Sequence, residues 1–200
     1  KITASNGREI KATADHKFMV YASASGTKRV WRKLKNLKPG DRLHVDSFST
    51  PEVDTYSQSY LGGFFLGVLQ GDGTLNGEHS ADLHLCGRKR ALLDILAEAG
   101  VVAKVSEGDK AVRVSFNHRA IELIRRHKFK NKESVEITDP EMMLGYIAGL
   151  ISTDGTITKT LTVVGDRSYL SQVQEMCQQL GLGLTTLHRS AAKGSVTNYA

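Results

Sequence analysis

Long apolar stretches are absent from this sequence of 200 residues. No run reaches the roughly 18 consecutive apolar residues that a membrane-spanning helix requires, so we expect no contact with a membrane. A basic segment followed by an apolar one is also missing at the start, so nothing in the sequence points to secretion. We therefore expect an intracellular protein, in the cytoplasm or nucleoid, or in the nucleus if its source is eukaryotic.

Cysteine is scarce, and the 2 that are present, Cys86 and Cys177, both lie in apolar contexts. We expect buried free thiols in a reducing compartment and not a disulfide. The cysteines also lack the partner residues and the spacing of a zinc site. Acidic residues are fewer than basic ones, 21 against 27, and the resulting net charge of +6 favours a polyanionic partner, most often nucleic acid.

Glycine, by contrast, is placed regularly in two apolar runs, at 60–75 and 144–157. Small residues recur at every fourth position of each run, namely Gly63, Gly67 and Gly71 in the first and Gly145, Gly149 and Thr153 in the second. Each glycine inside a helix costs about 1 kcal/mol relative to alanine. Residues four apart share one face of a helix, and a small-residue face lets two helices approach closely. The pattern therefore predicts two helices packed against each other through these stripes.

Both runs end in Asp-Gly-Thr followed by an aliphatic residue, and similar patterns follow each run. An alternating strand, a turn and an amphipathic helix come after Asp72, and the same order comes after Asp154. Such an internal repeat predicts pseudo-twofold symmetry, which would bring the two carboxylates together at the ends of the paired helices. Close carboxylates repel unless a proton or a metal lies between them, and their hard oxygen atoms suit Mg²⁺.

The two runs resemble the LAGLIDADG motif of homing endonucleases, loosely in "FLGVLQGDG" (65–73) and closely in "IAGLISTDG" (147–155). The resemblance implies αββαββα repeats whose sheets form a saddle over the major groove of a long, specific double-stranded DNA site. It also implies that Asp72 and Asp154 bind the catalytic metal, with Mg²⁺ as cofactor. A lysine near the end of each repeat often sits beside the metals in this family, and Lys130 and Lys132 are the nearest positions here.

The first 50 residues have a different sequence pattern, which predicts short strands with alternating apolar and polar residues and includes a basic segment. "ATADHKFMV" resembles the Thr-x-x-His block of inteins, which implies splicing roles for Thr13 and His16, and "LKNLKPGDRL" resembles a later segment of the same Hint fold. The sequence opens at Lys1 without a splice-junction nucleophile and closes without a terminal His-Asn. We therefore expect an internal piece of an intein, which would act with the rest of the intein and its host protein.

The predicted fold class is α+β, an all-β Hint-like segment followed by a pseudo-twofold endonuclease whose second repeat is incomplete. The expected divisions are 1–50 for the Hint-like segment, 51–59 for a linker, 60–140 for the first repeat and 141–200 for the second. We expect a monomer. Basic and polar positions on the alternating strands and nearby turns are the candidate DNA contacts: His84, Arg88, Lys89, Lys104, Lys110, Arg113, His118, Lys159, Arg167, His188 and Arg189.

The predicted function is a site-specific double-strand DNA endonuclease that hydrolyses phosphodiesters with a divalent metal. One alternative is a protein-splicing module with an inactive endonuclease part. A freestanding endonuclease descended from an intein is another. The third is a non-catalytic nucleic-acid binder with the same fold, which the two intact acids, Asp72 and Asp154, argue against.

Overall fold

The computed structural model describes residues 1–5, 9–23, 26–44, 52–77, 79–130, 133–157, 160–182 and 185–187. The chain divides into two compact units, Lys1–Phe48 and Ser49–Ala200, which are described separately below. None of the described helices is both long and apolar enough to cross a membrane.

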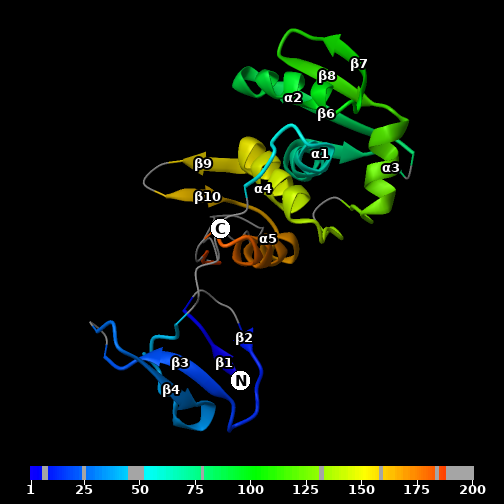
Figure 1. Ribbon diagram of the computed structural model, residues 1–200. Coiled ribbons are helices and arrows are strands. Elements are labelled where there is room, and N and C mark those ends of the chain that lie inside the picture. Colours follow the sequence, from blue (N-terminus) through cyan, green and yellow to red (C-terminus); the bar gives the residue numbers. More distant parts are fainter. Residues whose placement is uncertain are drawn as a thin grey trace. The chain divides into compact units, whose positions relative to one another are not determined.

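The first unit is built from short antiparallel strands (Figure 1). Its elements are β1 (Ile2–Thr3), β2 (Glu9–Ile10), β3 (Lys17–Tyr21), β4 (Arg29–Lys33) and the 3₁₀ helix η1 (Leu34–Asn36). The pairs are β1 with β2 and β3 with β4, and Val20 of β3 also bridges to Leu43. Val20 is fully buried, because alternation along β3 turns it away from solvent.

The second unit begins with a helix whose start is set by a side-chain cap. The hydroxyl of Ser57 accepts a hydrogen bond from the Tyr60 amide at 3.1 Å, so α1 starts at Gln58, inside the segment 51–59 that was expected to be a linker. The first half then runs α1 (Gln58–Asp72), β5 (Gly73–Leu75), β6 (Ala81–Cys86), η2 (Gly87–Ala91), α2 (Leu92–Glu98), β7 (Val102–Glu107), β8 (Ala111–Phe116) and α3 (His118–Arg126).

The strands of this half form one antiparallel sheet in the order β5-β6-β8-β7. Its apolar face, which includes Leu83, Leu85, Val112 and Val114, is buried in the same core as α1. The helices and strands of this half follow the αββαββα order that the sequence predicted: one helix, two strands, a second helix, two more strands and a third helix.

The second half repeats the beginning of this order. It contains α4 (Pro140–Asp154), β9 (Gly155–Ile157), β10 (Leu161–Val163) and α5 (Arg167–Gln179), with β9 and β10 paired antiparallel. Asp139 caps α4 and Pro140 occupies its first turn, where a missing amide hydrogen costs nothing. The unit is thus a mixed fold of helices and sheets, with α1 and α4 side by side at its centre (Figure 1).

The cysteines are only partly as expected. Cys177 on α5 is a buried free thiol, and burial raises its pKa. The expectation is wrong for Cys86, which is a free but exposed thiol. On β6, Leu83 and Leu85 turn inward, so the alternating residues His84 and Cys86 face solvent despite their apolar neighbours.

Candidate active site at the paired helix ends

The contact between α1 and α4 depends on glycines from both helices. A Cβ atom added to Gly67 would overlap the carbonyl oxygen of Tyr146 and lie 2.8 Å from the amide nitrogen of Leu150. A Cβ atom added to Gly149 would overlap the carbonyl oxygen of Phe64 and lie 2.9 Å from the amide nitrogen of Val68. Each glycine thus lets the backbone of one helix touch that of the other.

Further glycines extend this contact along both helices. Gly63 faces the backbone of Met142, and Gly145 faces the backbone of Tyr60. Gly71, the last of the first stripe, faces the side chain of Thr153 instead. The small-residue stripes therefore lie against each other over about two turns and end together.

Both helices end at an aspartate. Asp72 is the last residue of α1 and Asp154 the last of α4, and each is followed by an extended glycine whose amide bonds back to the preceding turn. The carboxyl carbon of Asp154 lies 3.3 Å from the position that a Cβ atom on Gly71 would take. The Asp154 carboxylate is therefore beside the last turn of α1, which Asp72 ends.

The electrostatics of this place favour a cation. The C-terminal end of a helix carries a partial negative charge. The C-terminal residue of α1 is Asp72 and that of α4 is Asp154, so each helix end also carries a carboxylate. Neither α1 nor α4, both described along their whole length, has a basic residue in its last turn to offset that charge.

One cation reaches the site from another element. Nζ of Lys89, in η2, lies 2.5 Å from a carboxylate oxygen of Asp72, and the two side chains are 35% and 21% exposed. The pairing of β5 with β6 explains this position: Gly73 lies opposite Leu83, so the end of β6 and the turn after it pass the end of α1. Lys89 is predicted to contact DNA, and the structure places its ammonium group against the candidate metal ligand.

Of the two lysines expected beside the metal, the structure describes only Lys130. Lys130, which follows α3, is exposed and pairs with Glu133 at 3.7 Å. Lys132 lies outside the described residues. Sequence spacing could not single out Lys89, because its approach to Asp72 depends on the strand pairing and not on distance along the chain.

A buried tyrosine lies near the second carboxylate. Tyr169 of α5 is fully buried, and its hydroxyl donates to the carbonyl oxygen of Val164 at 3.4 Å. Burial, together with the charges of Asp154 and Asp166, raises the pKa of Tyr169 to about 12. The phenol is therefore neutral at ordinary pH and adds no charge beside Asp154.

The solvent face of the four-stranded sheet collects several of the predicted DNA contacts. His84 of β6 lies directly opposite Arg113 of β8, and Lys104 of β7 is opposite the neighbouring Ser115. Arg113 also contacts Asp82 at 2.7 Å, and this guanidinium lowers the pKa of the Asp82 carboxyl. One acid is thus part of this otherwise basic and polar face.

The other predicted contacts are dispersed. Exposed positions are held by Arg88 in η2, Lys110 in the turn between β7 and β8, His118 at the start of α3, and Arg167 at the start of α5. Lys159, His188 and Arg189 lie outside the described residues.

In the first unit, Thr13 and His16 bracket a tight turn. The amide of His16 donates to the carbonyl oxygen of Thr13 at 3.1 Å, and both residues are exposed. The His16 ring packs on Phe18, with ring centroids 4.9 Å apart. The two residues that a splicing role would need thus lie at either end of one exposed turn.

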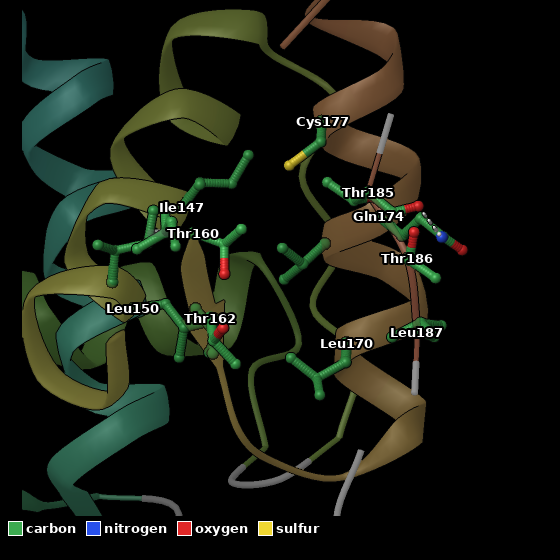
Figure 2. A pocket seen from close by; sticks show the side chains of 14 residues that line it. Ile147, Leu150, Thr160, Thr162, Leu170, Gln174, Cys177, Thr185, Thr186 and Leu187 are labelled. Carbon is green, nitrogen blue, oxygen red and sulfur yellow. Dashed lines mark hydrogen bonds between the residues drawn. The ribbon is translucent and has the colours of Figure 1, made fainter. Parts of the chain in front are cut away.

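A hollow of about 410 Å³ in the second unit is not the candidate site. It lies between α4, β10 and α5, with Ile147 and Leu150 on the α4 side and Leu170 and Cys177 on the α5 side (Figure 2). Its lining is largely aliphatic, with threonines and Gln174, and includes neither Asp72 nor Asp154. Its described lining residues include no charged side chain, so they offer nothing to hold a metal or a phosphate.

Comparisons with known proteins agree on the fold. No protein-family model matches the chain, and no curated protein is similar to it in sequence. Among solved structures, mesophilic variants of the homing endonuclease I-DmoI share 15% identity and a TM-score of 0.51, with 71% of this chain and 84% of that chain covered.

Two further structures extend this comparison. I-DmoI in complex with DNA and Ca shares 15% identity and a TM-score of 0.50, covering 71% of this chain and 81% of that one. The N-terminal LAGLIDADG domain of DUF199/WhiA shares 13% identity and a TM-score of 0.49, covering 72% and 75%. The neighbours with a TM-score of 0.50 or more are structures of the homing endonuclease I-DmoI, and at 15% identity the likeness concerns the fold alone.

Proposed function

We propose that the second unit is a metal-dependent endonuclease that cuts double-stranded DNA at a long, specific site. The observation that carries the proposal is that Asp72 and Asp154 end two helices in direct backbone contact, with the Asp154 carboxylate beside the last turn of α1. A pseudo-symmetric pair of carboxylates suits a substrate whose two strands are themselves related by twofold symmetry, with one acid serving each strand. I-DmoI, which has the same fold, has been crystallised with DNA and a divalent metal.

The donor set fits a hard divalent cation such as Mg²⁺. Among the described residues no group of three or more His, Cys, Asp or Glu side chains could hold a metal ion, so the protein would contribute the two carboxylates. Mg²⁺ is commonly held by one or two carboxylates, with water and substrate phosphate as the other ligands. When bound, such a cation would neutralise charge on the reacting phosphate.

Lys89 has a defined part in this proposal. Its ammonium group contacts Asp72, so it fixes the orientation of that carboxylate and offsets some of the charge at the helix ends. We assign it as a positioning residue of the first half.

The solvent face of the β5-β6-β8-β7 sheet would contact the major groove of the duplex. His84, Lys104 and Arg113 share this face, and a curved antiparallel ribbon with polar side chains fits that groove. Most contacts by such cations go to phosphates and set position, whereas fewer go to base edges and set the sequence.

Cleavage by aspartate variants tests the proposal. A plasmid library with a randomised insert, incubated with the complete protein and Mg²⁺, should yield linear products with a common sequence at the cut ends. Asp72→Asn and Asp154→Asn should each abolish linearisation, because asparagine keeps the shape but loses the charge that holds the cation. Asp94→Asn, at an exposed position of α2, is the matched control and should cut like the wild type.

The competing results are distinct. Full linearisation by Asp72→Asn or Asp154→Asn would show that these acids only end their helices. Sequence-specific duplex binding by the wild type without any cleavage would favour a non-catalytic DNA-binding protein.

A second candidate function concerns the first unit, which we propose to be a Hint-like segment of an intein. The exposed turn that brings Thr13 and His16 together supports it, because a hydroxyl and an imidazole can polarise a peptide bond for attack. In a precursor with its flanking protein, Thr13→Ala and His16→Ala should reduce splicing and leave DNA cleavage unchanged. Splicing at the wild-type rate in both variants would reject the assignment.

A further inference from the structure

The positive charge of the chain is concentrated in the smaller unit. Residues 1–48 hold 11 Lys and Arg against 4 Asp and Glu, a net charge of +7, whereas residues 49–200 hold 16 against 17, a net charge of −1. The unit with the two candidate catalytic acids therefore contributes nothing to the net positive charge. A polyanion is attracted chiefly to the first unit.

Within the first unit, the β3–β4 ribbon has two unlike faces. The register pairs Lys17 with Lys33, Met19 with Trp31 and Tyr21 with Arg29. Because side chains alternate along a strand, these residues share one face, which we call the cation–aromatic face: Lys17, Met19, Tyr21, Arg29, Trp31 and Lys33. The opposite face carries the buried Val20, and its Arg32 is held by Asp41 at 2.6 Å.

Trp31 is the centre of the cation–aromatic face. Its side chain is 64% exposed, although tryptophan has the largest apolar surface of any residue. It lies between Arg29 and Lys33 on β4, so one face of this strand carries a cation, an indole and a second cation at every other residue. Asp15, His16, Lys17 and Trp31 line a shallow hollow on this side of the ribbon.

Two cations of this face, Arg29 and Lys33, contact neighbouring side chains. A guanidinium nitrogen of Arg29 lies 3.1 Å from Nε2 of His44, and Nζ of Lys33 lies 3.2 Å from Asp15. The Arg42 guanidinium lies over the Tyr21 ring, 5.2 Å from its centroid. Ordering these side chains before a ligand arrives lowers the entropy cost of binding.

We infer that the cation–aromatic face binds nucleic acid with unpaired bases, with one base stacked on Trp31 and phosphates held by Lys17 and Arg29. Every base has a flat face that stacks on an aromatic ring, and nearby cations neutralise the backbone between bases. In a duplex those faces are covered by neighbouring base pairs, so an indole on a flat ribbon can stack only on unpaired bases. This site uses neither Asp72 nor Asp154 and does not depend on the proposed cleavage.

Tryptophan fluorescence gives a direct test, because Trp31 is the single tryptophan of the chain. The full chain, in EDTA to prevent cleavage, is titrated with a single-stranded oligonucleotide of mixed sequence. Stacking should quench the emission to saturation. If two phosphates are bound, raising the salt from about 50 to about 200 mM should weaken binding about sevenfold, since single strands lose about 0.7 counterion per contact. Arg29→Gln and Lys17→Gln should each weaken binding several-fold.

Variants of aromatic residues separate stacking from charge, with binding followed by anisotropy of a labelled oligonucleotide. Trp31→Leu should weaken binding roughly tenfold or more, and Trp31→Phe should retain most of the affinity. Tyr56→Leu is the matched control, because Tyr56 is an equally exposed aromatic residue of the other unit, at 75% exposure. Circular dichroism should show an unchanged fold in Trp31→Leu, since the side chain is not part of the core.

Three results would overturn the inference. The first is equal quenching and affinity with heparin, a polyanion without bases. The second is equal quenching by a blunt duplex, which offers no unpaired base in its interior. The third is an unchanged affinity in Trp31→Leu. Each is measured without metal, so none bears on whether Asp72 and Asp154 support cleavage.

Discussion

At the scale of single residues, Lys89 shows how one contact changes the chemistry of a site. The carboxylate of Asp72 lies at the negative end of α1 and would repel its counterpart on Asp154. The ammonium group of Lys89, 2.5 Å away, offsets part of that charge but also competes with any metal for the same oxygen. If the site binds a cation as proposed, the same residue would both stabilise the metal-free site and weaken its affinity for that cation.

This competition can be measured. Lys89→Gln should bind Mn²⁺ at least several-fold more tightly than the wild type, because it removes a positive charge that contacts the Asp72 carboxylate, a candidate metal ligand. The same variant should cut DNA more slowly, since Asp72 loses the contact that orients it. Calorimetric titration with Mn²⁺ in the absence of DNA gives the affinity.

Lys128→Gln is the control for this prediction. Lys128 makes a comparable ion pair with Glu136 at 2.8 Å but lies outside the candidate site. Equal Mn²⁺ affinities for Lys89→Gln, Lys128→Gln and the wild type would mean that Lys89 does not share an oxygen with the metal.

At the scale of elements, the α1–α4 pair shows which features of the fold sequence spacing can predict. The four-residue period of glycines predicted the helix contact, and the repeated Asp-Gly-Thr predicted where both helices end. The strand, turn and helix after each run followed from alternation and from amphipathic periodicity. These features are local or periodic, so they can be recognised without knowing which strands pair.

The features that were missed depend on pairing or packing. Lys89 reaches Asp72 only because β6 returns beside β5, and Cys86 faces solvent only because its strand has one buried face. Lys130 was favoured for its position near the end of a repeat, yet it pairs with Glu133. Register and side-chain direction are set by long-range contacts, which spacing along one chain does not encode.

The helix contact predicts a reversal of ordinary helix propensity. Gly67→Ala and Gly149→Ala should each lower the free energy of unfolding by roughly 1–3 kcal/mol, because the new methyl group would overlap a carbonyl oxygen of the opposite helix. In a helix without this contact, the same change would stabilise by about 1 kcal/mol. Urea unfolding followed by circular dichroism measures the difference.

Gly62→Ala is the matched control within α1. A Cβ atom at Gly62 would meet the flexible end of Met142 at 3.2 Å, and its next nearest atoms belong to the side chain of Leu123 at 3.5 and 3.7 Å, so that variant should be neutral or more stable. If Gly67→Ala and Gly62→Ala unfolded at the same urea concentration, close backbone contact would not be what the glycines provide.

At the scale of the whole molecule, two buried tyrosines set an alkaline limit to stability. Burial raises the pKa of Tyr146 strongly, and burial with the charges of Asp154 and Asp166 raises that of Tyr169 to about 12. Between about pH 10 and pH 12 the unfolded chain loses phenol protons that the folded chain retains, so the free energy of unfolding falls as the pH rises. Below about pH 10 these tyrosines add no pH dependence.

Unfolding measured at pH 8 and pH 11 tests this limit. The wild type should lose stability between the two values, and Tyr169→Phe should lose less, because phenylalanine has no proton to release. Tyr56→Phe serves as the control, since Tyr56 is 75% exposed. Identical losses in the wild type and Tyr169→Phe would show that Tyr169 titrates normally in the folded protein.

The direct backbone contact between α1 and α4 has a consequence for how such chains diverge. The separation of Asp72 from Asp154 is fixed by main-chain atoms that meet at glycines, so exchanges among the other core side chains leave that separation unchanged. Lineages can therefore replace nearly all of the surrounding sequence while retaining the same acid-to-acid spacing. Searches for distant relatives should accordingly weight a pair of Gly-x-x-x-Gly runs, each ending in an acid, above overall identity.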